Sequence, residues 1–97
     1  MGPQAGAADR PMMRWDARRW LAEETGCPVN ELELVDDRSG NQTIQATYQL
    51  GQMPYATLTG MLLDPGPGRQ RFWAIDAVLE DGRRLSTDVR ANRPIQL

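Results

Sequence analysis

The chain has 97 residues, a net charge of −2 and 25% charged residues, which is the composition of one small globular domain. It contains no histidine and no lysine, so all 11 basic side chains are arginines. General bases near neutral pH are usually histidine or a lysine of lowered pKa, whereas arginine stays protonated and binds planar anions. This inventory argues against an enzyme and favours a protein that acts by binding.

Cys27 is the only cysteine, so an internal disulfide and a cysteine metal cluster are both excluded. We therefore expect no metal and no cofactor. The longest apolar run, Met61 to Leu63, is much shorter than a membrane span, and the N-terminus lacks the apolar core of a signal peptide. These features predict a cytoplasmic protein without membrane contact.

Three segments differ in composition. Residues 1–12 are small, polar and rich in glycine, alanine and proline, and we expect a disordered leader there. Residues 13–90 are expected to form a single globular domain, and residues 91–97 a C-terminal tail.

A short helix is predicted over residues 16–25. Asp16 is placed as its N-cap, Trp15 and Trp20 occupy the two positions of a hydrophobic staple, and Gly26 supplies the left-handed residue after the last turn. The residues expected on the inner face of the helix are Ala17, Trp20, Leu21 and Glu24.

From residue 31 onward the apolar residues recur with a period of two, which is typical of strands. The clearest strand has Ile44, Ala46, Tyr48 and Leu50 on one face. The predicted strands cover about residues 31–35, 43–50, 55–63 and 71–79, followed by a fifth strand after the Glu80-Asp81-Gly82 turn.

Gly60 lies inside the third predicted strand, just before the continuous apolar run at Met61. A glycine within a strand together with a change of phase predicts a bulge or a sharp bend.

The turn at residues 80–82 predicts the register of the last hairpin. A three-residue loop with Gly82 in the left-handed region pairs Ala77 with Leu85, whereas a two-residue loop would split the apolar residues between faces. The same register pairs Ile75 with Thr87 and Trp73 with Val89. It leaves Phe72, Ala74 and Val78 on the opposite face, so this strand should be central, or should meet the helix or a partner.

The predicted fold is therefore α+β, with a short N-terminal helix packed on a strongly bent five-stranded antiparallel sheet or small barrel. The layout is similar to that of SH3-like and Sm-like domains in element order alone, without a sequence motif.

Residues 17–35 also resemble a helix-turn-helix in spacing, with Ala22 and Gly26 at the characteristic positions. The segment that would read DNA carries Glu31 and Glu33 and no arginine, so phosphates would be repelled. We therefore favour a helix, a Gly-Pro turn and a strand.

The sequence offers few residues for cation binding or for nucleophilic catalysis. Asp36, Asp37 and Asp64 could offer oxygen ligands to a cation, but aspartates before serine and glycine are usually turn formers. No histidine or lysine is present to activate Ser39, Ser86 or Cys27 as a nucleophile.

The sequence thus predicts a small non-catalytic binding or regulatory protein, an accessory subunit or inhibitor of a larger bacterial or phage machine. Its partner would be another protein; pairing with a second copy is a further option. The residues expected to contact the partner are Arg69, Arg71, Phe72, Arg83, Arg84 and Arg90. The alternative is a small nucleic-acid-binding domain that uses an Arg-rich sheet edge or the segment at 17–35, with bases stacked on Tyr48, Tyr55, Phe72 or Trp73.

Overall fold

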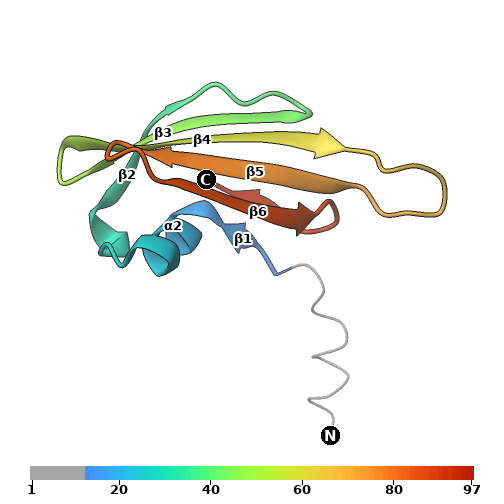
Figure 1. Cartoon of the computed structure of the whole chain (residues 1–97), viewed down its shortest axis with the longest axis horizontal. Coiled ribbons are helices and arrows are strands. Elements are labelled where there is room, and N and C mark those ends of the chain that lie inside the picture. The colour runs from blue at the N-terminus through green and yellow to red at the C-terminus, as the bar shows by residue number, and fades with distance from the viewer. Residues whose placement is uncertain (1–12) are drawn as a thin grey trace, which may run out of the picture.

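The computed structural model describes residues 13–97, and the expected leader at 1–12 lies outside the described residues (Figure 1). The elements in chain order are β1 (Trp15–Asp16), α2 (Ala17–Thr25), the 3₁₀ turn η1 (Val29–Glu31), β2 (Leu32–Asp37), β3 (Thr43–Leu50), β4 (Met53–Leu63), β5 (Phe72–Leu79), β6 (Arg84–Arg90) and β7 (Ile95–Gln96).

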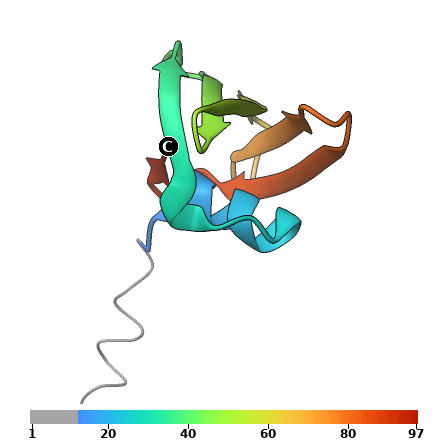
Figure 2. The same ribbon diagram turned by 90° about the vertical axis from the view of Figure 1, so that its left-hand side faces the viewer.

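The five central strands form one antiparallel sheet in the meander order β2-β3-β4-β5-β6, and β1 pairs with β7 in a separate parallel pair. The expected α+β class and five-stranded sheet are therefore confirmed. The sheet is curved, and α2 and β1 lie on its concave side (Figure 2), while Ile95 and Leu97 of the C-terminal segment pack against the same core. The edge strands β2 and β6 do not pair with each other, so the sheet is open and the small barrel that the sequence suggested is not formed. Between the two edges, side chains of α2 and β1 join the core instead.

The helix forms as its capping residues predict. The Asp16 carboxylate accepts a hydrogen bond from the Arg19 backbone N–H at 3.1 Å, and the rings of Trp15 and Trp20 lie 5.6 Å apart. Gly26 ends the helix with φ of +81° and donates its N–H to the Ala22 carbonyl.

The inner face of α2 is narrower than expected. Ala17 and Leu21 are fully buried and Trp20 is half-buried, but Glu24 is exposed, so its placement on the inner face was wrong. Glu24 lies one residue before the end of α2. Its carboxylate has no ion-pair partner within residues 13–97 and remains in water. The segment after the helix is a 3₁₀ turn followed by strand β2, as we favoured, so the second helix of a helix-turn-helix is not formed.

A single hydrophobic core fills the concave side of the sheet. Small side chains alternate there with large ones, so the helix can approach the sheet closely. The fully or nearly buried core residues are Trp15, Ala17, Leu21, Leu32, Ile44, Ala46, Tyr48, Ala56, Leu58, Ile75, Ala77, Leu79 and Val89.

The predicted register of the last hairpin is confirmed at all three pairs. Gly82 has φ of +93°, and the Leu79 N–H donates to the Arg83 carbonyl at 2.9 Å, which closes the three-residue loop. Phe72, Ala74 and Val78 consequently lie on the convex face of β5.

The bulge expected at Gly60 is not formed, because β4 stays in regular register with both neighbours on either side of this residue. Gly60 lies instead between Ile44 and Ile75, and a Cβ there would come within 3.2 and 3.3 Å of their side chains. The register shifts occur near Val35 in β2 and at Tyr55 in β4. The glycine therefore makes room for the close packing of the two isoleucines.

The last residues of the chain contribute to the core. Ile95 and Leu97 pack against it, and β7 pairs with β1 in parallel. Arg93 donates hydrogen bonds to the carbonyls of Met13 and Arg14, both at 3.0 Å.

Tyr48 connects β3 to this C-terminal segment. Its side chain is buried, and its hydroxyl donates a hydrogen bond to the Leu97 carbonyl at 3.0 Å. Burial raises the pKa of the Tyr48 phenol above its ordinary value, so the hydroxyl keeps its proton.

Replacement of Tyr48 by phenylalanine should lower the free energy of unfolding by about 1 kcal/mol, the usual worth of one such hydrogen bond. It should also speed hydrogen exchange in residues 95–97 more than in β3. Urea unfolding and amide exchange measure these effects. An unchanged stability together with unchanged exchange would show that the hydroxyl does not hold the C-terminal segment.

Among residues 13–97 there is no helix of the length and hydrophobicity that a membrane crossing requires.

Candidate binding surface

The six residues that we expected to contact the partner lie in two separate groups in the structure. Arg69 and Arg71 lie in the loop between β4 and β5, and Phe72 and Arg90 face each other across β5 and β6 at the same end of the sheet. The remaining two, Arg83 and Arg84, lie at the other end. Six residues of strand separate the groups, which corresponds to about 20 Å.

Apolar side chains accompany the first group on the convex face. Leu63 of β4, Phe72 of β5 and Arg90 of β6 form one cross-strand row. Met61 lies in the next row and is 55% exposed, and Leu63 is 37% exposed. Met61 and Leu63 also line a shallow groove that includes Ala74. An exposed apolar group of this kind beside arginines is typical of contact surfaces.

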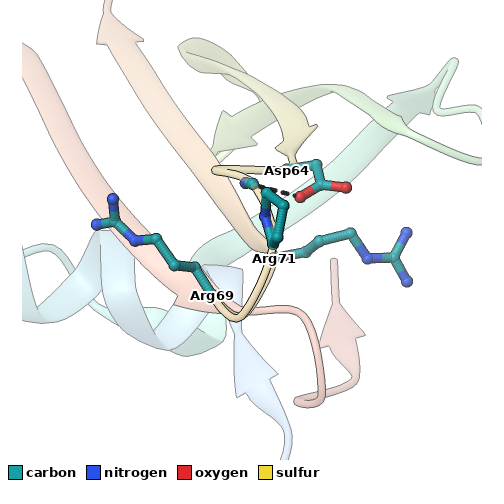
Figure 3. Close-up of a pocket in the computed structure, with 5 residues that line it drawn as sticks. Asp64, Arg69 and Arg71 are labelled. Atoms are coloured by element: carbon teal, nitrogen blue, oxygen red, sulfur yellow. Dashed lines mark hydrogen bonds between the residues drawn. The ribbon is translucent and has the colours of Figure 1, made fainter.

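The loop that carries the two arginines is held by its own backbone. The Asp64 carboxylate accepts a hydrogen bond from the Gly66 N–H at 3.0 Å, and the Gly66 carbonyl accepts one from the Arg69 N–H at 3.2 Å. The side chains of Arg69 and Arg71 extend to opposite sides of the loop (Figure 3). The two guanidinium groups are exposed and can reach separate anionic groups of a partner.

We call this group the loop-end surface and define it as Met61, Leu63, Arg69, Arg71, Phe72 and Arg90. Within residues 13–97, none of its three arginines has a carboxylate within ion-pair distance. Its charge is therefore not neutralised by the part of the chain that the structure describes.

In the other group only Arg83 has a carboxylate partner, and Arg84 has none among residues 13–97. Arg83 donates from Nε to the Asp81 carboxylate at 2.8 Å, and its backbone N–H donates to the same carboxylate. These bonds, the backbone one first, hold the pKa of Asp81 below its ordinary value. Arg83 thus belongs to the β5–β6 turn, whereas Arg84 lies on the convex face opposite Val78.

The aspartates considered as cation ligands act in turns. Asp37 accepts a hydrogen bond from the Ser39 N–H at 3.0 Å, and hydrogen bonds from Ser39 lower the pKa of Asp37. Asp36 pairs with Arg38 at 2.9 Å. Over the described range, the carboxylates and the cysteine form no group of three that could hold a metal ion.

The serines considered as nucleophiles are also engaged. The Ser39 hydroxyl accepts a hydrogen bond from the Gln45 N–H at 3.0 Å, and the Ser86 hydroxyl donates to Asp76 at 2.6 Å. Both lie on the exposed side of the molecule, outside any enclosed cavity that would exclude water from a reaction.

The aromatic residues of the nucleic-acid alternative are mostly turned inward. Tyr48 is fully buried, and Tyr55 and Trp73 are half-buried against the core. Phe72 alone among these four lies on the convex face.

Sequence reasoning missed Met61 and Leu63 as surface residues. It took the run at 61–63 as a change of phase at Gly60, whereas strand alternation continues through the glycine and leaves Met61 and Leu63 on the convex face. The signal was present in the unbroken period of two from Ala56 onward.

Comparison with protein-family models, with curated proteins and with solved structures found no match to this chain.

Proposed function

We propose that this chain is a non-catalytic binding protein that contacts an acidic surface of another protein through the loop-end surface. The observation that carries the proposal is the convex-face row of exposed Leu63, half-buried Phe72 and exposed Arg90, beside two further arginines without carboxylate partners in residues 13–97. Apolar anchors surrounded by arginine favour an apolar contact bordered by carboxylates.

An accessory subunit or inhibitor of a larger bacterial or phage machine is the class we favour. The support is that the chain has no histidine or lysine for proton transfer and a single half-buried cysteine. We place the protein in the cytoplasm because its cysteine usage fits a reducing compartment. The SH3- or Sm-like layout remains part of this proposal only as a similarity of strand order.

Replacement of Phe72 by alanine should weaken binding to the partner at least about tenfold, the effect of losing a central aromatic anchor. The matched control is Val78→Ala, because Val78 is 38% exposed on the same face of the same strand at its other end. The immobilised wild-type chain first captures partners from an extract of the source organism. Each captured protein is then purified and titrated with both variants.

Loss of affinity in Phe72→Ala with retention in Val78→Ala supports the proposal. Equal affinities for both variants, or a larger loss with Val78→Ala, would place the contact elsewhere. Circular dichroism of each variant confirms that the fold is retained.

Binding of single-stranded nucleic acid is the second candidate, because Phe72 could stack on a base while the neighbouring arginines contact phosphates. A labelled single-stranded oligonucleotide tests it directly. Affinity that falls steeply as salt rises, and that is lost in Phe72→Ala, would favour nucleic acid over protein. A protein contact depends on the apolar anchor and much less on ionic strength.

A further inference from the structure

Strand β6 is an edge strand, and most backbone groups on its free side have no hydrogen-bond partner within residues 13–97. The Leu79 N–H donates to the Arg83 carbonyl and the Ala91 N–H to the Arg71 carbonyl, which fixes the residues of β6 that bond to β5. Leu85, Thr87 and Val89 belong to that set. The N–H and C=O groups of the alternate residues Arg84, Ser86 and Asp88 consequently point to the free edge, whereas the Arg90 carbonyl accepts a hydrogen bond from the Arg93 N–H at 3.0 Å.

The opposite edge of the sheet, strand β2, has features that prevent another strand from pairing with it, and β6 lacks these features. Strand β2 has a register shift near Val35 and carries the exposed acidic residues Glu33, Asp36 and Asp37. A bulge and a row of like charges are devices that prevent strand addition. Strand β6 pairs with β5 without any shift over its seven residues, and its charges alternate in sign along the free edge.

We infer that β6 pairs antiparallel with β6 of a second copy, with Ser86 opposite Ser86 at the two-fold axis. This register places Arg84 of each copy opposite Asp88 of the other, so two ion pairs form on the convex face. Centring the pair on Thr87 would place Arg84 opposite Arg90, and centring it on Asp88 would place two carboxylates in contact. Charge therefore selects one register among the three.

The paired strands would join two sheets into one. Three hydrogen-bonded pairs contribute about six backbone bonds, and the half-buried side chains of Leu85 and Thr87 cover each other on the concave side. Such a contact is small, so the dimer should form in the micromolar range. The two-fold axis is perpendicular to the sheet. Both loop-end surfaces therefore lie on the convex face of the joined sheet. The inference does not depend on the proposed function.

Sedimentation velocity over a concentration series measures the fraction of the chain that forms dimers. Ser86→Pro should abolish it, because proline removes an N–H that points to the free edge and is not used by β5. Ser86→Ala is the matched control, since it also loses the hydroxyl bond to Asp76 but keeps the N–H, and it should dimerise like the wild type.

Charge reversal tests the register. Arg84→Asp and Asp88→Arg alone should each weaken the dimer about tenfold, because each change places like charges opposite each other at two positions of the dimer. The double variant should restore the affinity of the wild type. Stronger association of Arg84→Asp would indicate the register centred on Thr87 and overturn the inference.

Cross-linking gives an independent readout. Ser86→Cys should form a disulfide-linked dimer on oxidation, because two Cα atoms of a hydrogen-bonded pair lie about 5.5 Å apart, within the range of a disulfide. Thr87→Cys, whose partner in this register is Leu85, should not cross-link, and the wild type reports any contribution of Cys27. A monomer at all concentrations up to about 1 mM, without cross-linking at Ser86→Cys, would refute the pairing.

Discussion

Replacement of Leu58 by alanine should lower the free energy of unfolding by about 3 to 5 kcal/mol, the upper part of the range for a buried leucine. Leu58 is fully buried in the centre of β4, and its neighbours in the same sheet row are Ala46 and Ala77. Neither alanine has a side chain that could move into the space left behind. A small domain has about 5 to 10 kcal/mol of total stability, so the loss is a large fraction of it.

Chemical unfolding in guanidinium chloride measures this effect. Leu63→Ala is the matched control, because Leu63 lies in the same strand but on the convex face and is 37% exposed. It should change the stability by less than about 1 kcal/mol. If Leu58→Ala does not fold, Leu58→Met should still fold, at a cost below about 1.5 kcal/mol. Equal stabilities of Leu58→Ala and Leu63→Ala would contradict the assigned core.

Replacement of Gly60 by valine is expected to be the second most damaging change, with a loss of about 2 to 3 kcal/mol. A Cβ at this position comes within 3.2 Å of two Ile44 carbons and 3.3 Å of an Ile75 carbon, and valine adds two further methyl groups. Both isoleucines belong to the core, so neither can move away freely.

A double-mutant cycle tests this explanation. Gly60→Ala should be destabilising alone and less so, or neutral, in combination with Ile44→Val, because the smaller side chain makes room for the new methyl group. Thr59→Val is the control on the exposed face of the same strand and should leave the stability nearly unchanged. Additive effects of Gly60→Ala and Ile44→Val would show that the two residues are not in contact.

Most of the local structure could be predicted from the sequence because local chemistry determines it. The cap at Asp16, the left-handed glycines at 26 and 82 and the apolar alternation of β3 each depend on residues close together in the chain. The register of the last hairpin was predictable for the same reason, since a short loop leaves few ways to pair the apolar residues.

Features that depend on distant contacts were not predictable. The residues next to Gly60 in the sequence do not indicate that two isoleucines from adjacent strands will flank it. The pairing of β1 with β7, and the bond from Tyr48 to Leu97, join residues far apart in the chain. Whether the sheet closes into a barrel depends on what lies between its two edges, which the strand count does not show.

The loop-end surface was predictable only in part. Arginines of a Pro/Gly-rich loop and the first residue of the next strand are near each other in sequence, so the structure also places Arg69, Arg71 and Phe72 at one end of the sheet. Arg83 and Arg84 were named with Arg90 as expected contacts, but the antiparallel hairpin places these two residues and Arg90 at opposite ends of β6.

Hydrogen exchange of the chain with and without its purified, captured partner tests whether the loop-end surface binds. We expect binding to slow exchange in residues 61–72 and around Arg90, at the loop end of the sheet. Exchange in the turn at residues 80–83 should stay unchanged. Protection confined to α2 or to that turn, with residues 61–72 unaffected, would contradict the claim that the loop-end surface is the binding site.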